Sequence, residues 1–339
     1  MNSKLKQIKF FSLLAVLPLF LAGCKTGPVD DVFLYREEVR FDISDHLAPG
    51  VPITALYAVD EKNYGYASGD KVVWVRNGTE RTVTLTSAIL DIAWDGARQT
   101  LWAGTVASGL ACVDEEGVTY YTTKSHGLPR DVIMHVACDN VGRVWFASSA
   151  HLLGGLCCLS GSSLHIFTPE NSILPDNLIK DIACSGSKTY VATGGSVGQQ
   201  KVVEIDDTSW NLLPVEGYYL MDMDVSSHGT LYVIDDVGLS SSSYMTNKVY
   251  RYRNDSVTSM LPDYHRFEYV PVCVKADLRD YLWVSAYSRD DLHNLMVYDG
   301  ENWLETPAGF PALFIRSMAV DRSNGLWLGS TEGIYILRQ

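Results

Sequence analysis

Residues 128–148 read LPRDVIMHVACDNVGRVWFAS, and this stretch contains the unit that decides the fold. A Leu-Pro connection leads into an apolar strand, an Asp-x-x-Gly turn begins at Asp139, and a second strand follows with Trp145 as its leading aromatic residue. Asp suits such a turn because its side chain caps its own backbone, and Gly suits it because it tolerates positive φ. The stretch therefore predicts two adjacent strands joined by a tight turn.

The same pattern recurs along the chain with a regular spacing. Its leading aromatic residues are Tyr66, Trp102, Trp145, Tyr190, Tyr232, Trp283 and Trp327. Their separations are 36, 43, 45, 42, 51 and 44 residues. A period of this length with four short strands per unit is typical of a β-propeller. The high content of Tyr, Trp and Gly also favours strands and tight turns over helices.

The two ends of the repeat region indicate how the ring closes. The last unit ends at residues 333–337, which read as a third strand, so this unit lacks an outer strand of its own. Residues 38–43 read as an outer strand, and residues 45–49 after it resemble a connection between units. We therefore predict an all-β, seven-bladed propeller over residues 32–339, with four-stranded antiparallel blades. The N-terminal strand would complete the last blade and leave no exposed sheet edge.

The N-terminal segment is typical of a targeting signal and not of a folded domain. Three Lys precede an apolar run at residues 10–21, which is too short to span a bilayer comfortably. The sequence Leu-Ala-Gly-Cys that ends at Cys24 resembles the bacterial lipoprotein signal. The resemblance implies a signal peptide at residues 1–23, acylation of Cys24, and a lipidated tether at residues 24–31. The predicted location is the cell envelope, anchored to the outer membrane by lipid and facing the periplasm or the outside, with an ordinary secretory signal as the alternative.

The charge of the chain argues against one class of partner. The formal net charge is −13, and loss of residues 1–23 would remove three Lys and no acid, which gives −16. An acidic surface repels the phosphate backbone, so we predict no binding to nucleic acid.

Six cysteines remain beyond Cys24, and four of them match in pairs between repeats. Cys138 and Cys184 share one repeat position, and Cys112 and Cys158 share another. We interpret them as free thiols that serve as small core residues, although an exported protein could also bridge a pair. No Cys-x-x-Cys motif occurs, which argues against zinc ligation.

The pattern of inner strand, Asp-x-x-Gly turn and Trp-containing strand, clear at residues 136–148 and 319–330, resembles the two-component regulator propeller repeats. In that family such repeats form periplasmic sensor domains of hybrid histidine kinases, often linked to polysaccharide use. The resemblance covers about residues 32–339. The chain has one propeller and no transmembrane, kinase or DNA-binding segment, so we interpret it as a freestanding, lipid-anchored relative. A second resemblance, to streptogramin-lyase-like propellers, brings no catalytic motif.

One repeat position near the start of each inner strand is a candidate site. It lies four residues before the turn Asp and holds Leu56, Asp91, His135, Asp181, Asp222, Cys273 and Ser317. In a closed ring these positions converge near the channel mouth, and Asp224 shares a strand face with Asp222. They could bind a cation or sugar hydroxyls. The alternative is that they cap backbone amides of the neighbouring blade and hold water in the channel.

The loops after the leading aromatic strands are a second candidate site, because they lengthen in units three to six. The residues they bring are His151, Tyr244, Tyr287, Arg289, Asp290, Asp291 and His293. Tyr, Arg and Asp together suit contacts with carbohydrate or protein. Tolerated insertions without a partner are the alternative.

Catalytic signatures are missing from the sequence. There is no HExxH, no Gly-x-Ser-x-Gly and no Walker Lys, and we interpret Trp210 and Trp303 as packing residues of outer strands. We predict no catalytic residues and no cofactor beyond a channel cation. The favoured function is a binding module for a glycan or a partner protein, linked to polysaccharide sensing or use. The alternatives are a propeller enzyme, either a polysaccharide lyase or hydrolase or a streptogramin-lyase-like enzyme, and a scaffold in an envelope complex.

Overall fold

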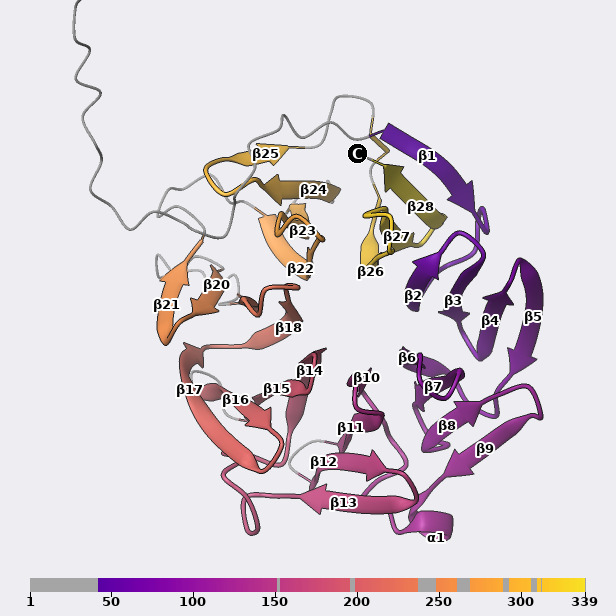
Figure 1. Ribbon diagram of the computed structural model, residues 1–339, viewed down its shortest axis with the longest axis vertical. Helices are drawn as coiled ribbons and strands as arrows, with labels where there is room; N and C mark the ends of the chain where they lie inside the picture. The colour runs from indigo at the N-terminus through magenta and orange to yellow at the C-terminus, as the bar shows by residue number, and fades with distance from the viewer. Residues whose placement is uncertain are drawn as a thin grey trace, which may run out of the picture. The chain divides into compact units, whose positions relative to one another are not determined.

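The computed structural model describes residues 42–150, 153–195, 199–236, 248–260, 269–288, 293–305, 310–311 and 313–338. These residues form seven four-stranded antiparallel sheets, which radiate from a common centre as the blades of a propeller (Figure 1). The predicted seven-bladed β-propeller is confirmed. The predicted signal peptide, Cys24 and the tether lie outside the described residues.

Each blade contains four strands in sequence order from the channel outward, except the last. The first three blades are β2 (Ala55–Asp60), β3 (Asn63–Ser68), β4 (Lys71–Arg76) and β5 (Thr79–Thr84); β6 (Ile89–Asp95), β7 (Thr100–Thr105), β8 (Leu110–Val113) and β9 (Val118–Tyr121); and β10 (Val136–Cys138), β11 (Arg143–Ala150), β12 (Leu153–Ser160) and β13 (Ser163–Phe167). The next three are β14 (Ile179–Ser185), β15 (Lys188–Thr193), β16 (Gln200–Asp206) and β17 (Ser209–Gly217); β18 (Leu220–Val225), β19 (Leu231–Asp235), β20 (Lys248–Arg253) and β21 (Ser256–Ser259); and β22 (Tyr269–Ala276), β23 (Leu282–Ser288), β24 (His293–Tyr298) and β25 (Trp303–Glu305). The seventh is β26 (Ile315–Val320), β27 (Leu326–Ser330), β28 (Gly333–Arg338) and β1 (Asp42–Leu47).

The N-terminal strand β1 closes the ring as predicted, but its bounds differ from the prediction. It pairs antiparallel with β28, and Ile43 lies opposite Leu337 while Leu47 lies opposite Ile334. The prediction that residues 45–49 form a connection is therefore wrong for residues 45–47, which continue the strand past an irregularity near Ser44. The ring of His46 stacks on Tyr335 at 4.1 Å and its Nε2 lies 2.9 Å from the Glu332 carbonyl, so side-chain contacts extend the pairing.

The hydrophobic core lies between the blades and not at the centre of the ring. Seven clusters of buried apolar side chains occur, and each joins two neighbouring blades. One cluster packs Trp145 of β11 against Ile179 and Ile182 of β14 and Val191 of β15. All seven leading aromatics lie on second strands and are buried, as the repeat predicts. The blades are thus held to one another by burial of apolar surface.

The turn aspartate ties the first two strands of a blade to its leading tryptophan. In the last blade, Asp321 Oδ1 accepts the backbone N–H groups of Ser323 and Gly325, both at 2.8 Å. Its Oδ2 accepts the indole N–H of Trp327 at 2.9 Å. The same indole-to-carboxylate bond occurs at 3.1 Å in two further pairs, Trp145–Asp139 and Trp283–Asp277. The conserved spacing of Asp and Trp in the repeat therefore has a direct hydrogen-bonding cause.

The second blade departs from this arrangement. Arg98 donates to Asp95 Oδ2 at 2.8 Å, and the buried indole N–H of Trp102 has no hydrogen-bond partner among the residues that the structure describes. An arginine next to the turn has replaced the tryptophan as the donor to the carboxylate.

The six described cysteines are free thiols, and four of them are buried. This confirms their interpretation as unpaired core residues.

Trp210 and Trp303 lie on the outer strands β17 and β25 as predicted. Trp210 packs against Phe167 at 4.8 Å, and the indole N–H of Trp303 donates to the Met260 carbonyl at 3.0 Å. Within the described residues the helical structure is the four-residue α1 (Thr123–His126), and no helix there is long and apolar enough to cross a membrane.

We predict that Asp321→Ala lowers the free energy of unfolding by about 3 kcal/mol or more. The substitution leaves the Trp327 indole, two backbone N–H groups and the Arg338 guanidinium, which donates to Asp321 at 2.7 Å, without their acceptor. Asp114→Ala is the matched control, because Asp114 caps only the backbone of its own hairpin turn. We expect about 1 kcal/mol for the control in urea unfolding. An equal loss for both variants would show that the indole and guanidinium contacts contribute nothing.

Candidate functional site

The inner strands carry an irregularity at the point where they enter the channel. In β6, Ile89 and Asp91 lie opposite Thr105 and Gly104, so Leu90 is an extra residue in the ladder. The same insertion occurs in β14, β22 and β26, where the extra residues are Lys180, Val272 and Arg316. A β-bulge bends the strand and changes the direction of its side chains. Here it aims two successive side chains of a blade at the channel mouth.

The candidate ring residues bind the backbone of the next blade. Asp91 accepts the N–H of Val136 at 2.9 Å, and Asp181 accepts that of Met223 at 2.6 Å. The equivalent bonds from the fifth and seventh blades are Val274 N–H to Asp222 at 2.7 Å and Leu56 N–H to the Ser317 hydroxyl at 3.1 Å. These contacts confirm the interpretation that ring residues cap amides of the neighbouring blade.

Two further ring members also reach the following blade. His135 Nδ1 lies 3.2 Å from Asp181 Oδ1, and the Cys273 thiol lies 3.9 Å from the Ile315 carbonyl. Two residues after Asp222 on β18, Asp224 accepts hydrogen bonds from the N–H of Ala276 at 2.8 Å and from the ammonium of Lys275 at 2.5 Å. The ring is therefore a chain of blade-to-blade contacts around the channel.

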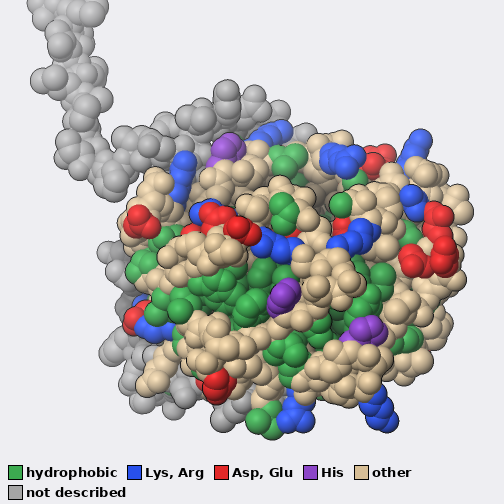
Figure 2. Space-filling view, turned by 60° about the horizontal axis from the view of Figure 1, so that its bottom comes forward, with side chains coloured by type: hydrophobic (Ala, Val, Ile, Leu, Met, Phe, Trp, Pro, Cys, Tyr) green, Lys and Arg blue, Asp and Glu red, His purple; other side chains and the backbone are tan. Residues whose placement is uncertain are grey.

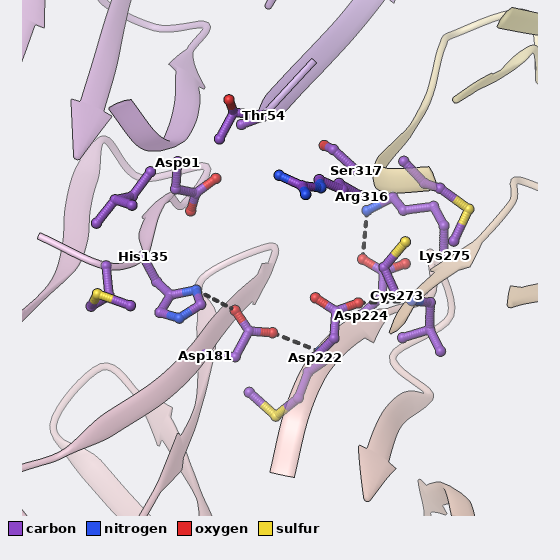
Figure 3. A pocket seen from close by; sticks show the side chains of 16 residues that line it. Thr54, Asp91, His135, Asp181, Asp222, Asp224, Cys273, Lys275, Arg316 and Ser317 are labelled. Atoms are coloured by element: carbon purple, nitrogen blue, oxygen red, sulfur yellow. Dashed lines mark hydrogen bonds and ion pairs between the residues drawn. The ribbon is translucent and has the colours of Figure 1, made fainter. Parts of the chain in front are cut away.

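All five predicted channel residues line one pocket, which we call the central pocket (Figure 3). Its volume is about 210 Å³, and residues from every blade contribute to its wall. The polar side chains that line it are Thr54, Asp91, His135, Asp181, Asp222, Asp224, Lys275, Arg316 and Ser317. The pocket is small and strongly polar, and it opens where the outer-to-inner connections enter the inner strands.

Burial and neighbouring charges shift the pKa of several of these groups. Burial raises the pKa of Asp91 to about 6, against the attraction of His135. Burial, with the charge of Asp181, also raises the pKa of Asp222 well above its usual value. Burial opposes the charged form of His135, but the hydrogen bond and charge of Asp181 outweigh it and raise the pKa of the imidazole. The central pocket therefore holds protons near neutral pH more readily than its composition suggests.

The carboxylates of the ring do not gather as metal ligands. Within the described ranges, no three His, Cys, Asp or Glu side chains come together in a way that could hold a metal ion. Their oxygens face backbone N–H groups in different blades instead. The predicted channel cation therefore finds no ligand set in this part of the chain.

A second layer of side chains comes from the residues that directly precede the ring residues in the inner strands, and it was not predicted from the sequence. It consists of Ala55, Leu90, Met134, Lys180, Met221, Val272 and Arg316. The layer is apolar apart from two cations, and each cation lies over an aromatic ring. The guanidinium of Arg316 is 5.0 Å from the centre of the Phe314 ring, and the ammonium of Lys180 is 4.0 Å from that of Tyr219. Shifting the comparison of the repeats by one residue would have exposed these two exceptions.

Arg316 is exposed and points into the central pocket (Figure 3). Among the described residues its guanidinium makes no hydrogen bond or ion pair, although four carboxylates line the same pocket. The guanidinium packs over the ring of Phe314, and its N–H groups remain available to a ligand.

A second cavity adjoins the first, and we call it the side pocket. Its volume is about 390 Å³, and it shares Met134 and His135 with the central pocket. The remaining lining residues are Val132, Ser149, Leu178, Ile179, Lys180, Tyr219, Leu220 and Met221. The wall is mostly apolar, in contrast to the central pocket.

Most of the large exposed apolar side chains lie on the face of the propeller where the central pocket opens. Six of the large exposed hydrophobic residues lie in its connections and loop ends: Val106, Met134, Leu153, Ile173, Tyr218 and Tyr219. Figure 2, which looks at one side of the molecule, shows hydrophobic side chains in the middle of the view with charged side chains around them. Clustered exposed apolar surface is typical of an interaction site.

The predicted loop residues are only partly described. Tyr287 lies on β23, and its ring is 6.2 Å from that of Phe314 beside the mouth. His293 is the first residue of β24. The others, His151, Tyr244, Arg289, Asp290 and Asp291, lie outside the described residues. The role of the long loops stays a prediction.

Solved propellers have similar structures. The streptogramin B lyase structure matches with a TM-score of 0.64 at 11% identity, over 88% of this chain and 97% of that chain. The extracellular domain of a putative hybrid two-component system from B. thetaiotaomicron matches with 0.62 at 13% identity, over 86% of this chain and 40% of that chain. PorZ, a surface component of the type-IX secretion system of Porphyromonas gingivalis, matches with 0.61 at 16% identity, over 88% and 48%.

At these identities the likeness establishes the fold alone. No protein-family model matches the chain, and no curated protein matches its sequence. The resemblance to two-component regulator propellers therefore holds at the level of the fold, which extracellular domains of such systems share. The chain is a seven-bladed propeller whose specific role has to be argued from its own site.

We predict that Asp91 makes the stability of the protein depend on pH. Because the pKa of Asp91 is about 6 in the folded state and lower in the unfolded chain, its favourable contribution is present at low pH and is lost between about pH 4 and 6. The stability advantage of the wild type over Asp91→Asn should therefore shrink by about 2 kcal/mol from pH 4 to pH 7. Denaturant unfolding at both pH values measures it, and a constant difference would contradict the raised pKa.

Proposed function

We propose that the protein is a cell-envelope binding module that takes a glycan at the mouth of the propeller channel and performs no chemistry on it. The observation that carries the proposal is the pair of adjacent cavities, one polar and one mostly apolar, with Lys180 over the ring of Tyr219 and Arg316 over the ring of Phe314 beside them. The rest of the propeller is a rigid scaffold for this site.

A sugar suits both halves of such a site. Its hydroxyls need acceptors and donors, which Asp222, Arg316 and Ser317 offer in the central pocket. Its C–H faces pack on aromatic and apolar side chains such as Tyr219 and Met134, which are 40% and 39% exposed. The two cavities together reach the range of about 300–1,000 Å³ that is usual for ligand sites.

The cellular setting of the proposal rests on the N-terminal sequence. Acylation of Cys24 would anchor the propeller to the outer membrane and present its mouth to envelope glycans. The fold is shared with extracellular domains of two-component systems, which supports a role outside the cytoplasm. A partner protein bound on the same exposed apolar face is the second form of this binding role.

A lyase or hydrolase is the alternative, and the His135–Asp181 pair favours it. A histidine whose pKa is raised by a carboxylate can donate a proton to a leaving group. Asp222 lies in the same pocket, and the streptogramin B lyase structure has a similar fold. Asp181 is already bound to two backbone N–H groups, at 2.8 and 2.6 Å, which favours a structural role for the pair.

We predict that the protein binds members of a glycan array and that Arg316→Ala weakens this binding at least tenfold. The substitution removes an exposed guanidinium that makes no hydrogen bond or ion pair to the described residues, so the fold should be unaffected. Val141→Ser is the control, because Val141 is exposed on a turn at the opposite face.

Mass spectrometry of the bound glycans separates binding from catalysis. Unchanged glycans support the binding module, whereas cleaved products that disappear in His135→Ala would support the enzyme. No binding to any glycan, together with a protein that copurifies, would replace the glycan by a protein partner.

We predict that the chain incorporates labelled fatty acid when it is expressed in a bacterium and that Cys24→Ser abolishes the incorporation. The thiol of Cys24 is the acceptor that the lipoprotein signal implies. Membrane fractionation of both forms is the second readout. Secretion of an unlabelled wild-type protein would indicate an ordinary signal peptide.

A further inference from the structure

We propose that the glycan carries an N-acyl substituent, such as the acetamido group of an N-acetylhexosamine, and that the side pocket receives it. This inference rests on the proposed function and specifies the chemistry of its ligand. It concerns the cavity between the third, fourth and fifth blades, which the ring of carboxylates does not reach.

The shape of the two cavities gives the first reason. They share Met134 and His135 in their walls, so a sugar ring at the central pocket would place a substituent close to the side pocket. Leu178, Leu220 and Met221 line the side pocket and offer no hydrogen bond from their side chains. A hydroxyl alone would leave this apolar wall uncovered, and a charged amine would lie beside the ammonium of Lys180 and lose its water against apolar side chains. The apolar wall therefore favours a substituent that ends in a methyl group or a longer alkyl chain.

A buried hydroxyl gives the second reason. Ser149 is 1% exposed and lines the side pocket, and among the described residues its buried Oγ has no hydrogen-bond partner. A buried hydroxyl without a partner costs roughly 1–3 kcal/mol, and native structures contain few of them. A group that enters the side pocket and offers one hydrogen-bonding atom beside an apolar end would remove this cost.

Two more buried polar groups behind the wall lack partners. Gln200 is fully buried; its Oε1 accepts the N–H of Leu220 at 2.7 Å, and its Nε2 is free. Asn177 Oδ1, next in the chain to Leu178, is also buried and has no partner in the described part of the chain. This corner of the fold therefore retains hydrogen-bonding capacity that the described protein groups do not use.

An acetamido group combines the two features that the side pocket requires. Its methyl group would lie against the apolar wall, and its carbonyl oxygen would accept a hydrogen bond from Ser149 once rotation of the serine side chain brings its buried Oγ to the surface of the pocket. A plain hydroxyl at the same carbon offers the hydrogen bond without the apolar end. An unsubstituted alkyl group offers the apolar end without the hydrogen bond.

Two trisaccharides with the same linkage and backbone test the inference. Chitotriose carries an acetamido group on each ring, and cellotriose carries a hydroxyl at the same carbon. Isothermal titration calorimetry with the full-length protein should give chitotriose an affinity at least about tenfold higher than that of cellotriose. Ser149→Ala should weaken binding of chitotriose about fivefold and leave cellotriose unchanged. The control Ser163→Ala, an exposed serine on β13 of the same blade, should change neither.

The outcomes separate the inference from the proposed function. Equal affinity for both trisaccharides, or binding only of glycans without N-acyl groups, overturns the inference and leaves the glycan module standing. Binding to no glycan at all overturns both. Thermal unfolding adds a readout without ligand: Ser149→Ala should keep or raise the melting temperature if the hydroxyl is unpaired. A clear drop would indicate that a fixed water satisfies it, which would contradict the inference.

Discussion

The innermost strand of every blade is an edge strand, and the structure depends on how its free N–H groups are satisfied. Each of the seven inner strands pairs with a strand on its outer side only, so its other edge faces the channel without a paired strand. Unpaired buried N–H groups would each cost free energy comparable to a lost hydrogen bond. Side chains solve the problem: Asp91, Asp181 and Asp222 each reach the backbone of the next blade. The carboxylates at the channel are therefore part of the ring closure before they are part of any site.

This constraint decides which polar groups are left for a ligand. Asp181 uses both oxygens on backbone N–H groups, and Asp224 divides its oxygens between Ala276 and Lys275. Asp222 commits Oδ2 to Val274 and makes no other hydrogen bond to the described residues. Arg316 makes none at all in that part of the chain. The polar groups that the ring contacts leave uncommitted are therefore one oxygen of Asp222 and, in the layer before the ring, the guanidinium of Arg316, which a bulge of β26 presents to the central pocket.

The sequence was sufficient for the architecture because the repeat encodes a physical contact. The spacing between turn Asp and leading Trp reflects the indole-to-carboxylate bond seen in Asp139–Trp145 and Asp321–Trp327. A buried leading aromatic recurs in all seven blades, so counting these aromatics counts the blades. The end of β1 could not be read in the same way. Residues 45–47 look like a connection in the repeat, but pairing with β28 and stacking of His46 on Tyr335 extend the strand. Such contacts, nearly the whole chain apart, leave no local pattern.

The site was harder to predict than the fold for a related reason. A bulge changes which side chains point into the channel, and its position follows from the packing of neighbouring blades, not from the alternation of one strand. Lys180 and Arg316 therefore looked like ordinary strand residues. The side pocket could not be predicted from the sequence either, because Ser149, Leu178 and Met221 come from three different blades. Only Asp91, His135, Asp181, Asp222 and Asp224 shared a repeat position or strand face that brought them together in advance.

The contacts of the ring also bear on the choice between binding and catalysis. A general base needs a lone pair that is free to accept a proton, and a nucleophile needs an open approach to the substrate. Burial raises the pKa of Asp222 and of Asp91, so both carboxyls bind protons more readily than usual, and His135 is held toward its protonated form by Asp181. The pocket thus contains several potential proton donors but no described carboxylate that is both ionised by preference and unbound. Such a set of groups can hydrogen-bond the hydroxyls and carbonyls of a sugar.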